Sequence, residues 1–279
     1  GARRAGYRMV FQIVHDFGHG ENDDGPAPDL VVHNMLDLIP VLEGELSRPN
    51  NGPGIQDRGG VRAILFDAGD LLYFRPQEGR RLQSFVESLG ISMPQDFQAR
   101  AEDLKSRAFC GEISQETYYE TLVRFCGVQD RRAIDEGKRI LREEGDDVRF
   151  FDGVRETLTR LKQRGFLLAI VTDTAQPVWA KLGWFEAEGI GHLWDAFVSS
   201  REVGFRKPDP RIYHAALRQL GVQPCEAVFV GHKATELDGA RAVGLTTIAF
   251  NRDADAEGDI SIEHFSELSE LPLLTASSR

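Results

Sequence analysis

Side chains capable of chemistry follow apolar segments at four places in the chain. Asp67 ends the segment at 61–67, and Thr172 ends the segment at 166–172. Lys207 lies between glycine and prolines at 204–210, and His232 and Glu236 follow the apolar segment 227–231. A carboxylate can serve as a nucleophile or a metal ligand, whereas hydroxyl and ammonium groups bind anions. The alternative for Asp67 is a purely structural role, in which it caps a helix.

The elements that must position these residues alternate along the chain. Apolar strands are predicted at 61–67, 166–172, 196–200, 227–231 and 245–250, and helices at 152–165, 209–221 and 234–244. Continuous apolar strands separated by helices are typical of a parallel sheet covered on both faces. The sequence therefore predicts an α/β fold with a doubly wound parallel sheet. Such sheets bind ligands at the carboxyl ends of their strands, where all four groups of residues lie.

The segment between the first and second strands of this sheet is too long for a simple crossover. Its helical periodicity and charge, with breaks at LGISMP and FCGEIS, predict an inserted all-helical cap at 75–148. The core then consists of 61–74 and 149–279. Apolar spacing at 82–90 and 118–127 is expected to pack the cap rather than contact a ligand.

The residues before the core divide into a linker and a partial repeat. Residues 47–60 are rich in Pro, Gly, Asn and Ser, which is typical of a linker. Residues 1–14 parallel 239–252, and 28–42 parallel 258–274, in the same order. The segment 1–46 is therefore interpreted as a partial repeat of the end of the core, without the first strand and its acid. We expect it to dock on the core or on another chain.

Composition excludes several classes of partner. The net charge of -11 and the pI of about 5.2 disfavour binding to nucleic acid or to anionic lipid. The three cysteines, Cys110, Cys126 and Cys225, form no CxxC pair, as expected of thiols in the cytoplasm. No apolar run reaches the roughly 18 residues of a membrane span, and a secretory signal is not expected. The sequence predicts a cytoplasmic location.

Four motifs in order make the chain from about 61 to 275 resemble the haloacid dehalogenase (HAD) superfamily, in its form with a helical cap after the first strand. The segments that carry the resemblance are FDAGD at 66–70, IVTDT at 170–174, SSREVGFRKPDPRIYHAAL at 199–217 and VFVGHKATELDGARAVGLTTIAF at 228–250. The resemblance covers about three quarters of the chain. It implies a HAD-like Rossmannoid core.

The resemblance also implies roles for individual residues. Asp67 stands at the position of the family's nucleophile, which forms an aspartyl intermediate. Thr172 would hold an oxygen of the transferred group, and Lys207 would pair with Asp67 and with that anionic group. Glu236 stands at the acid of the fourth motif. A Mg²⁺ site would use Asp67, the backbone carbonyl of Gly69, His232 and Glu236.

Two positions depart from the family pattern. Gly69 stands where most family phosphatases have an aspartate that protonates the leaving group and later activates water. Some family phosphatases that act on sugar phosphates resemble this chain in having Gly there. His232 stands where an aspartate is usual, and imidazole suits transition metals better than magnesium.

Three functions follow, in order of preference. The first is a phosphatase of a small phosphorylated metabolite that acts through an aspartyl-phosphate at Asp67. The second is a catalytically altered or inactive HAD-like module that binds a ligand or partner, which Gly69 and His232 together favour. The third is a metal-independent, dehalogenase-type hydrolase in which Glu236 positions water. In the first reading, Tyr73, Phe74 and Arg75 at the hinge of the cap contact the substrate.

Overall fold

The computed structural model describes residues 11–13, 30–32 and 60–275. The chain divides into two compact units, 1–57 and 58–279. This division falls within the predicted linker, most of which lies outside the described residues. In the first unit, β1 (Phe11–Ile13) pairs in parallel with β2 (Leu30–Val32).

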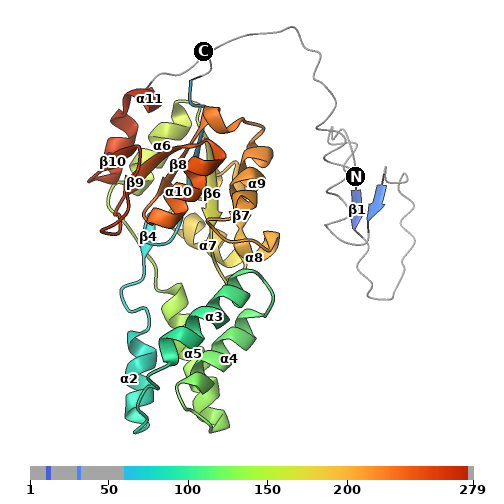
Figure 1. The fold of residues 1–279 in the computed structure, drawn as a ribbon, viewed down its shortest axis with the longest axis vertical. Helices are drawn as coiled ribbons and strands as arrows, with labels where there is room; N and C mark the ends of the chain where they lie inside the picture. Colours follow the sequence, from blue (N-terminus) through green and yellow to red (C-terminus); the bar gives the residue numbers. More distant parts are fainter. Residues whose placement is uncertain (1–10, 14–29, 33–59, 276–279) are drawn as a thin grey trace. The chain divides into compact units, whose positions relative to one another are not determined.

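The second unit contains a six-stranded sheet in which every neighbouring pair is parallel (Figure 1). The strand order is β10-β9-β8-β3-β6-β7. The strands are β3 (Ala63–Phe66), β6 (Leu167–Thr172), β7 (Ala196–Ser199), β8 (Ala227–Gly231), β9 (Thr246–Phe250) and β10 (Ile260–Ile262). The predicted α/β class with a doubly wound parallel sheet is confirmed.

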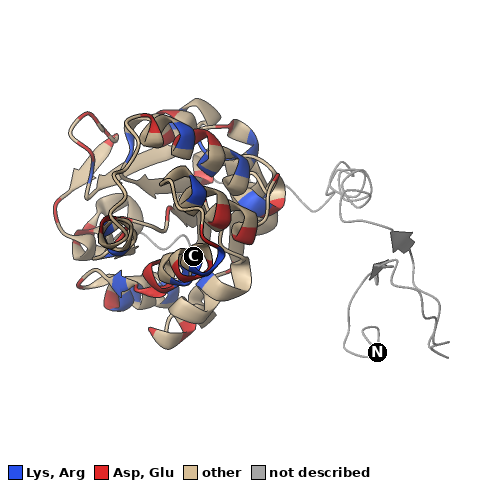
Figure 2. Cartoon of the chain, turned by 90° about the horizontal axis from the view of Figure 1, so that it is seen from below, with Lys and Arg blue, Asp and Glu red and all other residues tan. Residues whose placement is uncertain are grey.

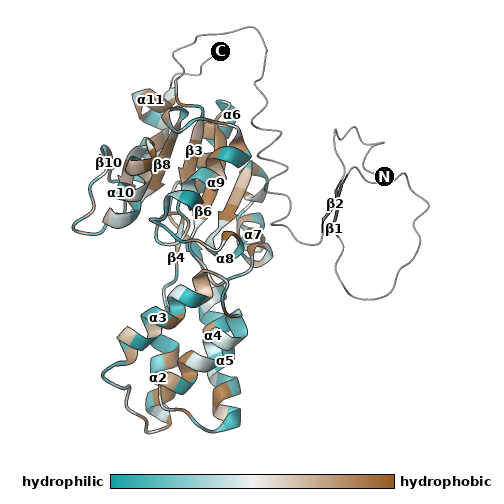
Figure 3. Ribbon diagram, turned by 45° about the vertical axis from the view of Figure 1, so that its right-hand side comes forward, coloured by the Kyte–Doolittle hydropathy of each residue, from teal (hydrophilic) through white to brown (hydrophobic). Residues whose placement is uncertain are grey.

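Helices cover both faces of this sheet, which explains why its strands are continuously apolar. Ile64 and Phe66 of β3 pack on one face with residues of α6, α7 and η5, while Ala63 and Leu65 pack on the other with residues of α9 and α10. Figure 3 shows the strands as the most hydrophobic elements of this unit. The elements are α6 (Val154–Gln163), α7 (Val178–Ala187), η3 (Gly191–Leu193), α8 (Ser200–Val203), α9 (Pro210–Leu220), η4 (Pro224–Glu226), α10 (Ala234–Val243), η5 (Phe265–Glu270) and α11 (Pro272–Thr275).

The winding of the chain fixes where a ligand site can form. The chain enters this sheet at β3 in its middle, passes to β6 and β7 on one side, and returns to β8 on the other side of β3. The strand order therefore reverses between β3 and β8. Ligands bind at such a reversal, outside the carboxyl ends of the strands.

Four helices form the cap that is inserted between β3 and α6. They are α2 (Arg80–Ser88), α3 (Phe97–Phe109), α4 (Gln115–Phe125) and α5 (Arg131–Asp146). Ser114 and Asp130 cap α4 and α5 by accepting hydrogen bonds from the amides of Thr117 and Ala133. The antiparallel pair β4 (Tyr73–Phe74) and β5 (Arg149–Phe150) lies where the chain enters and leaves the cap. The predicted all-helical cap is confirmed as part of the fold (Figure 1), while the domain boundaries stay predictions.

The predicted repeat has a partial parallel in the strands. In the alignment of the two sequence segments, β2 corresponds to β10. Strand β10 pairs in parallel with β9, and β2 pairs in parallel with β1. The rest of the segment 1–46 lies outside the described residues. The repeat and its docking therefore stay predictions.

The charged residues are distributed over the outside of the second unit. Figure 2 shows acidic and basic positions interspersed along its helices. In the described ranges, none of the helices combines the length and the apolarity needed to cross a membrane.

Candidate active site

The sheet brings residues from three strands to one edge. Phe66 of β3 lies opposite Ile170 of β6 and Val230 of β8, so the residues that follow these strands emerge side by side. The amide of Asp67 continues the ladder by donating to the carbonyl of Val230 at 3.0 Å. Parallel pairing thus places Asp67 beside the end of β6, which carries Thr172, and the end of β8, which precedes His232.

Asp67 is buried and lies between two cationic or potentially cationic groups. Its Oδ1 lies 2.5 Å from Lys207 Nζ and accepts a hydrogen bond of 2.8 Å from the amide of Ala68. Its Oδ2 lies 3.4 Å from His232 Nδ1, which has no other partner in the described part of the chain. Burial alone would raise the pKa of Asp67, but Lys207 and His232 outweigh it and hold the pKa well below its usual range. Asp67 is therefore ionised at neutral pH.

Lys207 contacts the carboxylates of both Asp67 and Glu236. Its Nζ also lies 2.8 Å from Glu236 Oε2, and the two groups form an ion pair. Burial by itself lowers the pKa of Lys207, but Asp67 and Glu236 raise it above its usual value. Burial raises the pKa of Glu236, and Asp67 adds to that rise while Lys207 opposes it. The ammonium is thus a permanent charge between two carboxyl groups.

The loop that carries Lys207 is held by its neighbours. The amide of Lys207 donates to Asp173 Oδ1 at 3.1 Å, and Asp209 accepts from the amide of Arg211 at the start of α9. Helix α10 packs directly on the loop, because a Cβ placed on Gly239 would lie 2.6 Å from Pro208 Cβ. These contacts hold the loop that positions Lys207 at the edge of the sheet.

Thr172 is fully buried and has a partner that the sequence did not reveal. Its Oγ1 accepts a hydrogen bond of 2.9 Å from Lys181 Nζ of α7, which also donates to Tyr73 Oη at 2.9 Å. The feature of the sequence that could have indicated this contact is the single lysine in the apolar segment VWAKLGWF. Periodicity alone does not show that this helix turns its lysine toward the end of β6.

These residues line one cavity of about 110 Å³ between core and cap. Lys105 and Phe109 of α3 contribute the wall from the cap, and the predicted hinge residues Tyr73 and Arg75 also line it, whereas Phe74 does not. The other lining residues are Asp67, Gly69, Asp70, Glu78, Thr172, Asp173, Lys181, Arg206, Lys207, His232, Lys233 and Glu236. Six lysines and arginines thus face five acids, and this favours an anionic ligand.

Gly69 leaves space at the position of the missing acid. A Cβ added there meets nothing within 4 Å, and its φ is not positive. The next residue, Asp70, adopts a φ of 57° and donates its amide to the carbonyl of Tyr73. The turn is therefore closed by the backbone, without a side chain at residue 69.

The predicted magnesium donors do not form a set that fits this ion. Mg²⁺ requires octahedral oxygen ligands, and His232 offers nitrogen. Lys207 already lies against the carboxylates of both Asp67 and Glu236. Across residues 60–275 no three His, Cys, Asp or Glu side chains gather as a metal site. The residues present thus do not support the expected Mg²⁺ site.

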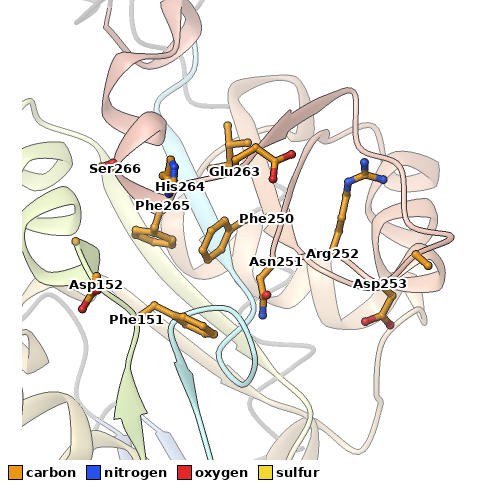
Figure 4. A pocket seen from close by; sticks show the side chains of 13 residues that line it. Phe151, Asp152, Phe250, Asn251, Arg252, Asp253, Glu263, His264, Phe265 and Ser266 are labelled. Carbon is orange, nitrogen blue, oxygen red and sulfur yellow. The ribbon is translucent and has the colours of Figure 1, made fainter.

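A larger hollow lies apart from Asp67. It has a volume of about 780 Å³ and is lined by Phe151–Gly153, Phe250–Ala254 and Ile262–Ser266. Figure 4 shows its side chains. The rings of Phe151, Phe250 and Phe265 pack edge to face, with centroids 5.9 and 5.4 Å apart. None of the candidate site residues Asp67, Thr172, Lys207, His232 and Glu236 lines this hollow, so we place the candidate site at the smaller cavity.

Comparison with known proteins identifies the family of the chain. The sequence model of the haloacid dehalogenase-like hydrolases matches residues 61–244. A glyceraldehyde 3-phosphate phosphatase of Methanopyrus kandleri is 28% identical over 221 residues, which are 74% of this chain and 92% of the relative. An (S)-2-haloacid dehalogenase 4A of Burkholderia cepacia is 31% identical over 129 residues, 46% of this chain and 53% of the relative.

Solved structures show the same fold. A HAD phosphatase from Thermococcus onnurineus aligns with a TM-score of 0.53 and 24% identity, covering 75% of this chain and 97% of that one. A 2-haloacid dehalogenase from Pseudomonas syringae aligns with a TM-score of 0.57 and 21% identity, covering 77% and 98%. With its motifs at one sheet edge and a family match over most of its length, the chain belongs to the haloacid dehalogenase-like hydrolases.

Proposed function

We propose that this hydrolase is a phosphatase of a small phosphorylated metabolite, with Asp67 as the nucleophile. The observation that carries the proposal is the contact of 2.5 Å between Asp67 and the buried Lys207 in a cavity rich in cations. Relatives named as glyceraldehyde 3-phosphate and phosphoglycolate phosphatases support it. The volume of the cavity, about 110 Å³, favours a small substrate.

The proposed reaction has two steps. A carboxylate oxygen of Asp67 attacks phosphorus, the bond from phosphorus to the substrate oxygen breaks, and the released alkoxide takes up a proton from solvent water. Water then attacks the phosphorus of the aspartyl-phosphate, phosphate leaves, and the carboxylate of Asp67 is restored. Lys207 and the hydroxyl of Thr172 stabilise the negative charge that spreads over the phosphoryl oxygens.

The decisive experiment measures phosphate release from an aryl phosphate, glyceraldehyde 3-phosphate, phosphoglycolate and a panel of sugar phosphates. We expect turnover by the wild type and a loss of at least about 10³-fold in Asp67→Asn. Each assay is run with Mg²⁺ and with EDTA. Because the donors do not fit magnesium, we expect turnover to persist in EDTA; loss of turnover there would restore the Mg²⁺ prediction.

A second candidate is dehalogenation, which the lack of a fitting magnesium donor set favours. Asp67 would displace halide from carbon, and water positioned by Glu236 would cleave the resulting ester. Halide release from 2-haloacids, absent in Asp67→Asn, would select this function. A folded wild type that releases neither phosphate nor halide faster than Asp67→Asn would favour the reading as an altered or inactive module that binds a ligand or partner.

A further inference from the structure

Lys181 is a buried cation that the proposed reaction does not use. It lies in α7 with 2% of its surface exposed, and it lines the same cavity as Asp67. Its Nζ donates to Thr172 Oγ1 and to Tyr73 Oη, each at 2.9 Å. Both partners are neutral hydroxyl groups.

The lack of a carboxylate partner distinguishes Lys181 from Lys207. Lys207 contacts two carboxylates directly. Within residues 60–275, no acid lies close enough to Lys181 to form an ion pair. A buried ammonium without a counter-ion is costly, so its charge calls for an anion nearby.

The surroundings act on the charge of Lys181 in both directions. Burial, followed by the charge of Arg75, lowers the pKa of Lys181 to about 7. Lys207 lowers it further, whereas the carboxylates of Asp67 and Asp173 raise it. The titratable or charged groups that face Lys181 are Asp67, Tyr73, Arg75, Asp173 and Lys207.

The hydrogen bonds of Lys181 determine how its partners can bind a ligand. An ammonium donates three protons and accepts none. The oxygens of Thr172 and Tyr73 must therefore accept from Lys181, which leaves their own protons for other acceptors. Thr172 and Tyr73 both line the cavity. Their hydroxyl groups are thus available as donors to an oxygen of a bound anion.

We propose that Lys181 is the second cation of the anion site: it positions the hydroxyls of Thr172 and Tyr73 as donors, and a tetrahedral dianion in the cavity supplies its missing counter-charge. This rests on the proposed function, in that the cavity takes a phosphorylated substrate. Lys181 acts through Thr172 and Tyr73 and is a positioning residue.

The proposal predicts a linkage between anion binding and protonation. A dianion favours the charged form of Lys181 and raises its pKa, so binding above pH 7 requires the uptake of a proton. The dissociation constant should therefore rise with pH above about 7, by at most about tenfold per pH unit. Without Lys181 this dependence should disappear.

Sulfate is the probe, because it is a tetrahedral dianion whose charge does not change between pH 6 and 9. Binding to the full chain is measured by titration calorimetry over this range, in buffers of different ionisation enthalpy. The variants are Lys181→Met, which keeps the length of the side chain, and the control Lys162→Met, whose lysine pairs with Asp195 and does not line the cavity.

In Lys181→Met, we expect sulfate affinity at pH 6 to fall about 10- to 100-fold, as for loss of a charged hydrogen-bond donor. The pH dependence should be lost, whereas Lys162→Met should behave as wild type. A dissociation constant and pH slope in Lys181→Met equal to those of wild type would overturn the proposal, as would a wild type that binds no sulfate.

A second variant covers the case in which Lys181→Met does not fold. Tyr73→Phe removes one acceptor of Lys181 and should move the onset of weaker binding to lower pH. An unchanged onset would assign the proton to another group and overturn the proposal. Sulfate binding needs no turnover, so failure of the phosphatase proposal would show separately, as absence of phosphate release with Lys181-dependent binding intact.

Discussion

Asp67, Lys207 and Glu236 illustrate how few side chains can define a reactive centre. One buried ammonium lies between two carboxylates, 2.5 and 2.8 Å away. The pKa of Asp67 is lowered despite its burial, whereas burial raises the pKa of Glu236. The two acids thus differ in basicity, as expected when one serves as an ionised nucleophile and the other can hold a proton.

The missing side chain at residue 69 allows a gain-of-function test. Gly69→Asp should fit, because its Cβ meets nothing within 4 Å, and it would supply an acid to the leaving oxygen. We expect kcat for an alkyl phosphate to rise about 100-fold, at the low end of general acid catalysis. Gly69→Asn is the matched control. Equal kcat in the two variants would show that the site already obtains this proton elsewhere.

At the scale of elements, the cap and core meet around the site through several polar contacts. Ser200 Oγ donates to the carbonyl of Phe109 at 2.7 Å, and Gln115 Nε2 donates to Gln176 Oε1 at 2.8 Å. Arg206 lies 3.6 Å from Glu102. These contacts place the C-terminal end of α3, with Lys105, over the cavity.

Closure of the cap can be tested at a glycine. Gly111 and Gly90 follow α3 and α2 with φ values of 74° and 73°, so alanine strains both backbones equally. A Cβ on Gly111 would also lie 2.5 Å from the carbonyl oxygen of Arg201 in the core, whereas one on Gly90 meets nothing within 4 Å. We expect Gly111→Ala to raise KM by about tenfold, corresponding to the roughly 1–3 kcal/mol of overpacking.

The comparison with Gly90→Ala separates closure from backbone strain. Both variants should lose about 1–2 kcal/mol of unfolding free energy in urea, the cost of a left-handed alanine, and the clash in Gly111→Ala can add up to roughly 1–3 kcal/mol. Only Gly111→Ala should change KM. A KM change of the same size in Gly90→Ala would mean that the effect comes from general destabilisation of the cap.

At the scale of the whole molecule, the charge of the cavity differs from that of the chain. The sequence has 44 acidic and 33 basic residues, yet basic residues outnumber acids in the lining of the cavity. An overall negative charge disfavours binding of polyanions such as nucleic acid. A small anion inside the cavity interacts mainly with the charged residues of the lining, among which basic residues outnumber acidic ones.

Deletion of residues 1–46 tests the role of the predicted partial repeat. All the candidate site residues lie between 67 and 236, so we expect the shortened protein to keep its kcat/KM. If the segment buries apolar strands, its removal should lower solubility or the melting temperature, which light scattering and thermal unfolding would show. A shortened protein as stable and monodisperse as the full chain would contradict the docking of this segment.

The sequence by itself determined the sheet, the cap and the order of the motifs. Strand ends in a parallel sheet share one edge, so Asp67, Thr172 and His232 could be placed together from their positions after apolar runs. The fold class inferred in this way is confirmed. The roles of the individual residues stay predictions that the assays above address.

Only the tertiary structure decided which charges meet. Lys181 reaches Thr172 because of how α7 packs on β6, and Lys105 reaches the cavity because the cap closes. Lys207 contacts Asp67, as the family resemblance implied, but it also contacts Glu236, where the sequence suggested magnesium. Such contacts depend on how separate elements pack, and burial and neighbouring charges then set the pKa values of the groups. The sequence pattern of a single element gives neither the distances between side chains of different elements nor their burial. These contacts and pKa values are therefore decided only when the elements pack together.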